Sequence, residues 1–279
     1  MLKPICKKLF LFGLMFSILF FNTVQAEDNN MTRVDICKKN YKVLFGGEAL
    51  TDKGNDAEIM DILQKYIFGD VFTIGEIDTK TREMVTVTVL AVEQTLPQLR
   101  AHINAALNVG VTPIELREVI YQCAPFIGFP KTLNALGVLN EVFKERGIKT
   151  PLESQTTVQE ETRYEKGLAI QTPIYGDEIK LAMAGLPDNM GDDVAKLLTE
   201  VCFGDFYTRK GLDVKTRELI VLSILVATGD TDTLKSHIKG NLKAAGNSEK
   251  DIASVIIQCM PYTGFPNALK ALKVLKEII

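Results

Sequence analysis

The chain contains one sequence pattern twice, and this duplication constrains the fold more than any other feature. The copies match at three motifs: FGDVFTIGEIDTKTRE (68–83), His102 and QCAPFIGFP (122–130) in the first, FGDFYTRKGLDVKTRE (203–218), His237 and QCMPYTGFP (258–266) in the second. The offset is 135 residues up to the histidine and 136 after it. Solenoid repeats have periods of about 20–50 residues, so this longer period indicates a duplicated domain.

The first 26 residues have the pattern of a secretory signal peptide. Three lysines precede the apolar run 9–21, and Val24 and Ala26 place small residues at −3 and −1 of a cleavage site after Ala26. The run is shorter than the ~20 residues that span a bilayer. Cys6 lies inside this segment, so a lipid-modified mature cysteine is not expected. We therefore expect a periplasmic or secreted protein without a stable membrane anchor after cleavage.

Composition limits the classes of partner. The formal net charge is −3 and no basic tract occurs, so nucleic acid is not an expected partner. The mature chain, about 250 residues, is long enough for two small domains with cores of their own. Without Cys6, four of the five cysteines remain, and none forms a CxxC motif. Four cysteines in so long a chain do not indicate a disulfide scaffold, even in an exported protein.

The chain divides at a polar connecting segment. Residues 149–162 contain Pro151 and no apolar periodicity, which is typical of a linker. The predicted domains are therefore residues 34–148 and 163–279.

Helix signals dominate both domains. Thr112, Pro113 and Glu115 form the pattern of a capping box at a helix start, and Ser248 with Asp251 repeats it. In each case apolar residues follow at helical spacing.

One repeated segment is ambiguous. Residues 85–90 alternate and are β-branched, which is typical of a strand. Their counterpart, residues 219–226, is apolar on all sides, and Asp78 and Asp213 are plausible N-caps before the two segments. We interpret both as buried central helices, which gives an all-α fold.

Each copy carries a Thr-Arg-Glu triplet one turn into its central helix. A carboxylate that enters a core needs a partner or a raised pKa. Glu83 and Glu218 could therefore act as general acids or bases, or orient the histidines. Alternatively the triplets supply helix-start charges, with Arg82 and Arg217 tethering neighbouring segments or lining a pocket.

His102 and His237 are the two histidines of the chain, one in each copy. Histidine is the side chain best suited to proton transfer near neutral pH, which favours a catalytic role over a structural one. One histidine and one glutamate per copy make a poor ligand set, so no metal site is expected.

Cys123 and Cys259 lie on the apolar faces of their helices, two residues before a proline. Cysteines in such positions are normally inert core residues. The alternative is a pocket thiol whose pKa a nearby histidine lowers.

Together these motifs resemble the carboxymuconolactone decarboxylase family, which shares its fold with AhpD-type alkylhydroperoxidases. The resemblance covers nearly the whole mature chain, once per domain. It implies two tandem helical domains packed as a pseudo-twofold dimer. The peroxidase branch carries Cys-x-x-Cys before its histidine, but these positions hold Thr95 and Gln98 in the first copy and Asp230 and Thr233 in the second. A peroxidase that cycles a disulfide of that design is therefore excluded.

The resemblance implies His/Glu acid–base chemistry on a small carboxylated or lactone substrate, without a cofactor. Glu83 with His102, and Glu218 with His237, would be catalytic. Tyr262 matches a tyrosine usual in the family, whereas its counterpart is Phe126, so the second copy is expected to be the more active. Export argues against a cytoplasmic lactone as the substrate. The resemblance also implies a homo-oligomer, a trimer of two-domain chains.

Two alternatives to this enzyme remain at the level of sequence. The first is a thiol-dependent antioxidant activity through Cys123 or Cys259 with an external reductant. The second is a non-catalytic binding protein that keeps only the fold.

Overall fold

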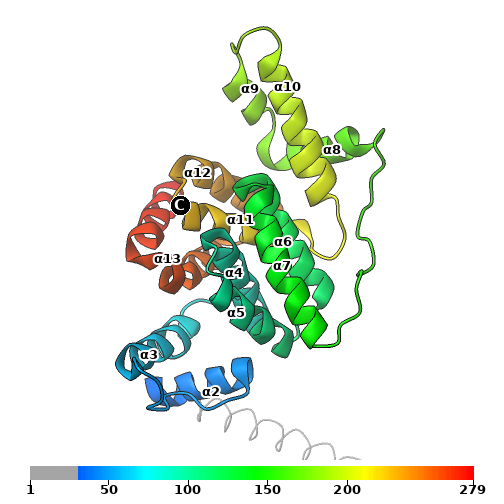
Figure 1. Cartoon of the computed structure of the whole chain (residues 1–279). Helices are drawn as coiled ribbons and strands as arrows, with labels where there is room; N and C mark the ends of the chain where they lie inside the picture. Colours follow the sequence, from blue (N-terminus) through cyan, green and yellow to red (C-terminus); the bar gives the residue numbers. More distant parts are fainter. Residues whose placement is uncertain (1–30) are drawn as a thin grey trace, which may run out of the picture. The chain divides into compact units, whose positions relative to one another are not determined.

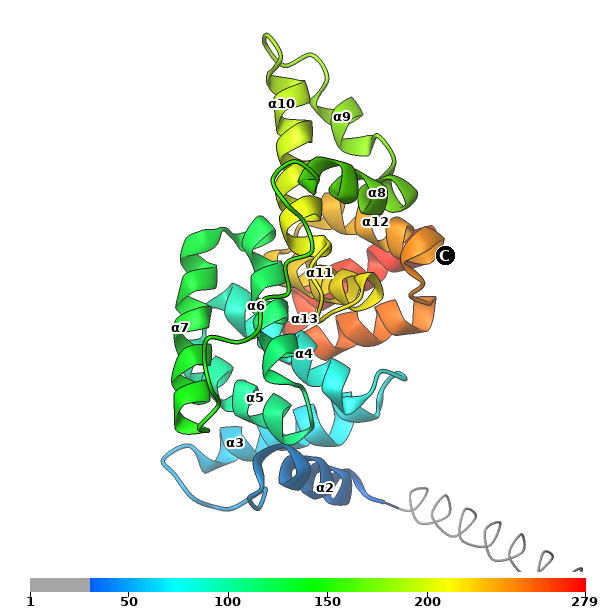
Figure 2. The same cartoon turned by 90° about the vertical axis from the view of Figure 1, so that its right-hand side faces the viewer.

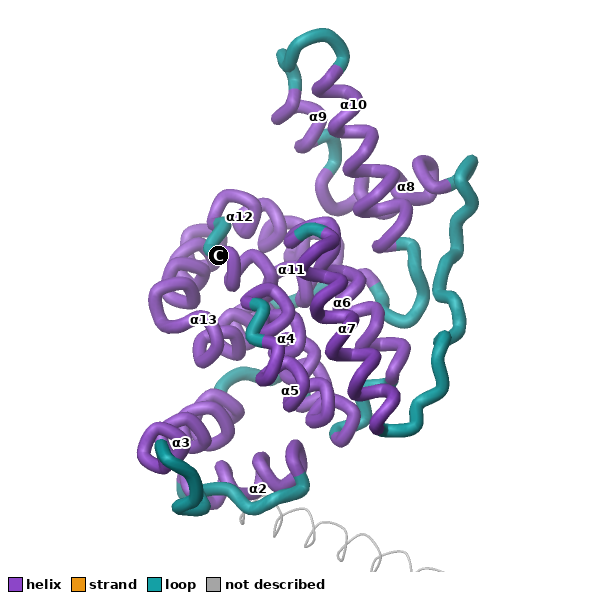
Figure 3. The backbone as a smooth tube through the Cα atoms, viewed as in Figure 1, coloured by secondary structure: helices purple, strands orange, loops and turns teal. Residues whose placement is uncertain are grey.

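The structure is a computed structural model and describes residues 31–279 (Figure 1). The predicted signal peptide, residues 1–26, lies outside the described residues. Figure 3 shows helices joined by loops, with no strand in the part of the chain that is described. The prediction of an all-α fold is therefore confirmed.

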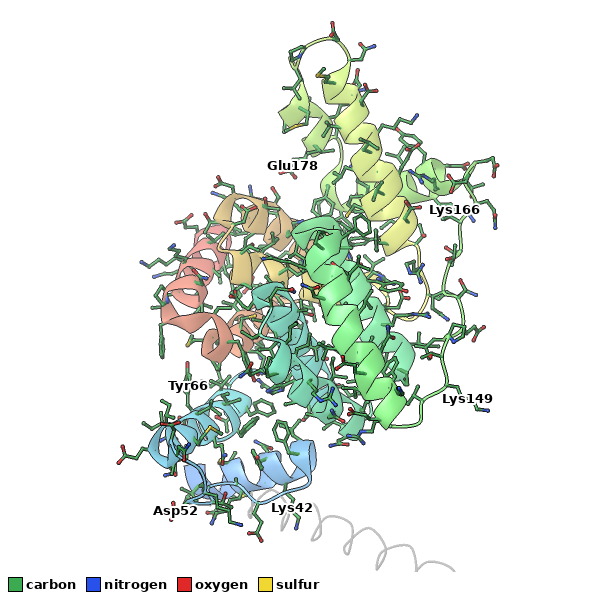
Figure 4. The ribbon with its side chains drawn as sticks, viewed as in Figure 1. Lys42, Asp52, Tyr66, Lys149, Lys166 and Glu178 are labelled. Carbon is green, nitrogen blue, oxygen red and sulfur yellow. The ribbon has the colours of Figure 1, made fainter. Side chains whose placement is uncertain are left out.

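The helices of the first copy are α2 (Arg33–Phe45), α3 (Ala57–Gln64), α4 (Thr79–Glu93), α5 (Leu96–Asn108), α6 (Pro113–Ile127) and α7 (Phe129–Glu145). Those of the second copy are α8 (Arg163–Tyr175), α9 (Glu178–Met183), α10 (Met190–Leu197), α11 (Val214–Thr228), α12 (Thr231–Gly240) and α13 (Glu249–Ile278). Short π- and 3₁₀-helical segments are η1 (Lys65–Asp70), η2 (Val71–Thr73), η3 (Leu198–Tyr207) and η4 (Asn241–Ala245). Of the two lysines labelled in Figure 4, Lys149 lies in the irregular segment between α7 and α8, and Lys166 lies in α8.

The described residues group into two compact units. The smaller comprises residues 31–42 and 47–70, and the larger residues 43–46 and 71–279. Inside the smaller unit, the Asn40 side chain donates to the carbonyl of Phe68 at 2.8 Å. The larger unit contains the central helices of both copies, because these helices share one core. The domain limits 34–148 and 163–279 stay predictions.

The central helices α4 and α11 are buried along most of their length and pack against each other. Both begin at the predicted N-caps: Asp78 accepts from the backbone N–H of Thr81 at 2.7 Å, and Asp213 from that of Thr216 at 2.8 Å. The ambiguous segment 85–90 is helical, as predicted. The hydroxyl of Thr88 in this segment donates to a carbonyl one turn earlier, so the helix itself satisfies this buried polar group.

The two copies pack reciprocally, as expected for a pseudo-twofold arrangement. Helix α4 contacts α6 of its own copy and α13 of the other, and α11 contacts α13 and α6 in the same way. The hydrogen bonds follow this exchange. Arg82 donates to Gln258 at 2.9 Å, and Arg217 donates to Gln122 at 2.9 Å. Figure 2 shows α4 and α6 beside α11 and α13.

The QC-x-P-[FY]-x-GFP motif gives the same bend in both copies. Gly128 has φ 80° and ψ 160°, and Gly264 has φ 77° and ψ 162°. A residue with a β-carbon is strained at such a positive φ, so glycine ends one helix here. The proline two residues later stands in the first turn of the next helix, a position that needs no N–H donor. Residues 249–278 are thus two helices joined at Gly264.

No helix within residues 31–279 has the length and apolar composition that crossing a bilayer requires. Export and the trimer of chains stay predictions.

Candidate active site

Each histidine lies against the glutamate of its own copy. Nδ1 of His102 is 2.8 Å from Oε2 of Glu83, and Nδ1 of His237 is 3.1 Å from Oε2 of Glu218. Both glutamates are 0% exposed. The central helix supplies the carboxylate, and the next helix, α5 or α12, supplies the imidazole. The two groups therefore lie within hydrogen-bond distance of each other in both copies.

The second copy surrounds its glutamate with further donors. The hydroxyl of Tyr207 donates to Oε1 of Glu218 at 2.6 Å. The hydroxyl of Tyr175 and the side-chain amide of Asn241 donate to Oε2 at 2.7 and 3.0 Å. With Nδ1 of His237, four groups contact one buried carboxylate. Such a number of donors favours the ionised form.

The electrostatics follow from these contacts. Burial alone raises the pKa of Glu218, but His237 and the two tyrosine hydroxyls outweigh it, and the pKa lies below its usual value. Burial, together with the charge of Glu218, raises the pKa of Tyr175 and of Tyr207. At neutral pH the site therefore combines an ionised carboxylate with two protonated phenols.

The hydrogen bonds also fix which ring nitrogen of His237 carries the proton. Nδ1 lies 2.6 Å from the hydroxyl oxygen of Tyr175, whose single proton goes to Glu218. Nδ1 must then be the donor in its contacts with Tyr175 and Glu218. A neutral His237 consequently has its lone pair on Nε2, for which no partner is recorded among residues 31–279.

A cavity of about 370 Å³ opens beside this network. Its wall is mostly apolar, and His237, Tyr175 and Tyr207 of the network are among the residues that line it. It is lined by Pro125, Phe126, Gln171, Tyr175, Glu178, Ile179, Ala182, Leu198, Cys202, Phe203, Tyr207, Asp232, Thr233, Ser236 and His237. The volume falls at the small end of the roughly 300–1,000 Å³ range of ligand sites.

The first copy lacks the additional donors. Phe72 aligns with Tyr207 in the repeated FGD motif, and Ala106 follows His102 by four residues as Asn241 follows His237. The ring of Phe45 lies 5.6 Å from the ring of His102, where the second copy has the ring of Tyr175 at 4.9 Å.

The consequence appears at the carboxylate of the first copy. Oε1 of Glu83 is buried and has no hydrogen-bond partner within the described chain. The His102–Glu83 pair therefore stands without the hydroxyl and amide donors that hold Glu218.

Tyr262 belongs to the site of the first copy, which corrects the expectation from sequence. Its ring lies 5.6 Å from the ring of His102, whereas His237 faces Phe126 at 5.9 Å. The cause is the reciprocal packing, because α13 of the second copy contacts α4 of the first. Tyr262, which suggested a more active second copy, thus lies in the site of the first copy. The expectation of a more active second copy now depends on Tyr175 and Tyr207, which donate to Glu218.

Arg82 and Arg217 do not line the cavity. Arg217 is fully buried and donates to Gln122, Glu118 and two backbone carbonyls. Arg82 donates to Gln258 and to the carbonyls of residues 71 and 74. Both side chains thus tether segments of the two copies, one of the two roles left open from sequence, and do not contribute to the pocket.

Cys123 and Cys259 are fully buried and do not line the cavity. Burial raises the pKa of each thiol to about 12. Both are free thiols, as are Cys37 and Cys202. Since the thiolate is the reactive form, neither Cys123 nor Cys259 is a good nucleophile at neutral pH.

We expect these thiols to be unreactive in the folded protein. A chromogenic thiol reagent should label Cys123 and Cys259 only after unfolding, and native mass should not change on reduction. The variants Cys123→Ser and Cys259→Ser serve to assign the signals. Rapid labelling of either cysteine, or peroxide consumption lost in either variant, would contradict the structure and restore the thiol-dependent alternative.

Sequence reasoning missed Tyr175, Tyr207, Asn241 and Cys202. The sequence contained two signals for them. Tyr207 stands where the first copy of the FGD motif has Phe72, and Asn241 follows His237 by one helical turn. Nothing in the sequence placed Cys202 in a cavity wall.

Comparison with known proteins finds related sequences for both copies. The sequence profile of the carboxymuconolactone decarboxylase family matches residues 57–141 and again residues 192–277. The 4-carboxymuconolactone decarboxylase of Acinetobacter baylyi is 25% identical over 122 residues, which cover 43% of this chain and 90% of the relative. The nitrosuccinic acid decarboxylase of Metarhizium robertsii is 25% identical over 85 residues, or 30% of this chain and 59% of the relative.

A solved structure shares the fold. A chain from Burkholderia xenovorans, assigned as a gamma-carboxymuconolactone decarboxylase subunit, has a TM-score of 0.50 and 20% sequence identity; the match covers 87% of this chain and 96% of that one. With two tandem family segments and the matching helical fold, the chain belongs to the carboxymuconolactone decarboxylase family.

Proposed function

We propose that the protein is a decarboxylase whose reaction centre is the cavity of the second copy. His237 acts as the proton donor and acceptor, and Glu218 orients it and balances its charge. The membership of the family and the relatives named as decarboxylases support the reaction class. The observation that carries the assignment to this site is the buried network on Glu218, which leaves Nε2 of His237 for a ligand in the adjoining cavity.

The proposed substrate is a small carboxylic acid or lactone acid in which the carbon that bears the carboxylate is attached to a carbonyl, either directly or through a C=C bond. The bond between this carbon and the carboxylate breaks, and its electron pair moves into the conjugated carbonyl while CO₂ leaves. The carbon then takes a proton from Nε2 of protonated His237, and solvent returns a proton to the imidazole. The anionic Glu218 stabilises the imidazolium that this step requires.

The remaining groups contribute position and environment. Tyr175 contacts both His237 and Glu218, so it holds the ring in one orientation. The apolar wall, with Phe126 and Phe203, gives the departing carboxylate surroundings less polar than water. A binding site with an apolar wall that holds its donors in advance is suited to a reaction in which charge moves within the substrate.

The reaction can be tested with a panel of small unsaturated carboxylic acids and lactone acids in D₂O. Turnover should release CO₂ and place one deuterium at the carbon that lost the carboxylate. Turnover should be lost in His237→Gln and retained in His102→Gln. Binding of panel members without CO₂ release, in the wild type and in both variants alike, would favour the non-catalytic alternative.

The proposed network also predicts how stability depends on pH. The pKa of Glu218 is lower in the folded than in the unfolded chain, so its contribution is complete above its ordinary pKa near 4.5 and is lost as pH falls through the folded value. Tyr207→Phe removes one of the bonds that lower this pKa. The folded and unfolded pKa values of Glu218 then differ less, so the stability of the variant should fall by less below about pH 4.5. The variant should also be less stable than the wild type by about 1–3 kcal/mol at pH 7.

Urea unfolding of the two proteins between about pH 7 and pH 3 measures this difference. Tyr164→Phe removes a hydroxyl from an exposed tyrosine and serves as the matched control. Identical pH profiles for Tyr207→Phe and the wild type would show that Glu218 does not depend on this donor.

A further inference from the structure

We propose that the cavity of the second copy selects substrates with at most one negative charge, and that Glu178 and Asp232 set this limit. The inference rests on the proposed function only in that it concerns the same cavity. Selection here means that a second carboxylate on the ligand weakens binding because two acidic side chains of the protein repel it.

The residues that line the cavity include acidic side chains but no lysine or arginine. The acidic side chains in the wall are Glu178 and Asp232. Within residues 31–279 no salt bridge neutralises either carboxylate. The group that can carry positive charge is His237, and Glu218 behind it already balances that charge. A ligand with several carboxylates therefore finds no cation to pair with.

Both acidic residues lie in the first turn of their helices. Glu178 begins α9, where Figure 4 labels it, and Asp232 lies in the first turn of α12. Both residues are exposed although they line the cavity, so they lie at its solvent-facing side, whereas His237 is buried. The hydroxyl of Ser236 on α12 donates to the carboxylate of Glu178 and holds it there. A ligand that places one carboxylate inside directs any opposite carboxylate toward these groups.

The size of the cavity limits how a ligand can place two carboxylates. A cavity of about 370 Å³ with Phe126 and Phe203 in its wall suits a ligand about as large as one ring. Across one ring, two carboxylates cannot both lie near His237. Glu178 and Asp232 are exposed, so solvent screens part of their repulsion of a second carboxylate. We expect the remaining repulsion to weaken binding about tenfold, which corresponds to about 1.4 kcal/mol.

Binding in the cavity can be followed through the NMR signals of the two histidines. In full-length protein after signal cleavage, the ring Cε1–H groups of His102 and His237 should give two resolved NMR signals, assigned with His102→Gln. The probes are benzoate and terephthalate, which share one ring and differ by one carboxylate. We expect benzoate to shift the His237 signal with saturation, and terephthalate to bind at least about tenfold more weakly.

A double variant, Glu178→Gln with Asp232→Asn, should reduce this discrimination to within about twofold. The matched control is Glu153→Gln with Glu161→Gln, which removes the same charge from two exposed sites elsewhere and should retain the discrimination.

Three outcomes would overturn the proposal: terephthalate binding as tightly as benzoate in the wild type, discrimination unchanged in the double variant, or benzoate leaving the His237 signal unshifted. These readouts concern binding alone. Failure of the decarboxylase proposal would instead appear as selective binding without CO₂ release from any substrate.

Discussion

His237→Gln should lower kcat of the decarboxylation by about 10²- to 10⁴-fold, the range that general acid–base catalysis contributes. His102→Gln should lower it by no more than about tenfold. The reason is the difference between the two carboxylates. Glu218 receives four donors beside a cavity, whereas Oε1 of Glu83 is buried without a partner. The two substitutions are chemically identical, so each serves as the control for the other.

A second pair of variants separates catalysis from positioning. Glu218→Gln should reduce kcat about as strongly as His237→Gln, because the imidazolium loses its counter-charge. Tyr175→Phe should reduce kcat less and change its pH profile, since the hydroxyl contacts both His237 and Glu218. Circular dichroism and thermal unfolding establish that each variant is folded. Equal losses in His102→Gln and His237→Gln would require two equivalent reaction centres and would end the assignment to one site.

The sequence predicted much of the fold because its signals are local. The N-caps Asp78 and Asp213, the capping box at Thr112 and the bends at Gly128 and Gly264 each depend on residues within a few positions of one another. The duplication added the long-range information. Two central helices without a polar face had to cover each other, and α4 and α11 do so.

The candidate site could be predicted only in part. The spacing from glutamate to histidine is short enough for two successive helices to bring the groups together. Tyr175 is 43 residues from Glu218, and its contribution depends on how α8 packs, which no local pattern specifies. Tyr262 was assigned to the second copy because it belongs to that copy in sequence. Packing between the copies places it on His102 instead.

The largest effect on stability is expected at Glu118, a residue outside the reaction centre. Glu118 is fully buried on α6 and accepts hydrogen bonds from Arg209 at 2.8 and 2.9 Å and from Arg217 at 3.2 Å. Glu118→Ala leaves the fully buried Arg217 without its carboxylate. Breaking a buried ion pair in this way costs about 3–5 kcal/mol in the free energy of unfolding.

Urea unfolding measures this cost, with Glu141→Ala as the control. Glu141 pairs with Arg100 at the surface at 3.1 Å, and loss of such an exposed pair should cost at most about 1 kcal/mol. A cost below about 1 kcal/mol for Glu118→Ala would mean that the remaining partners of Arg217 satisfy it without the carboxylate.

The same substitution tests how the site depends on the packing of the copies. Arg217 precedes Glu218 on α11, and Glu118 belongs to the other copy, so this ion pair joins the copies next to the catalytic carboxylate. If the position of Glu218 depends on this junction, Glu118→Ala should lower kcat under conditions in which the variant remains folded. Unchanged kcat in folded Glu118→Ala would show that Tyr175, Tyr207 and Asn241 suffice to position Glu218 from within the second copy.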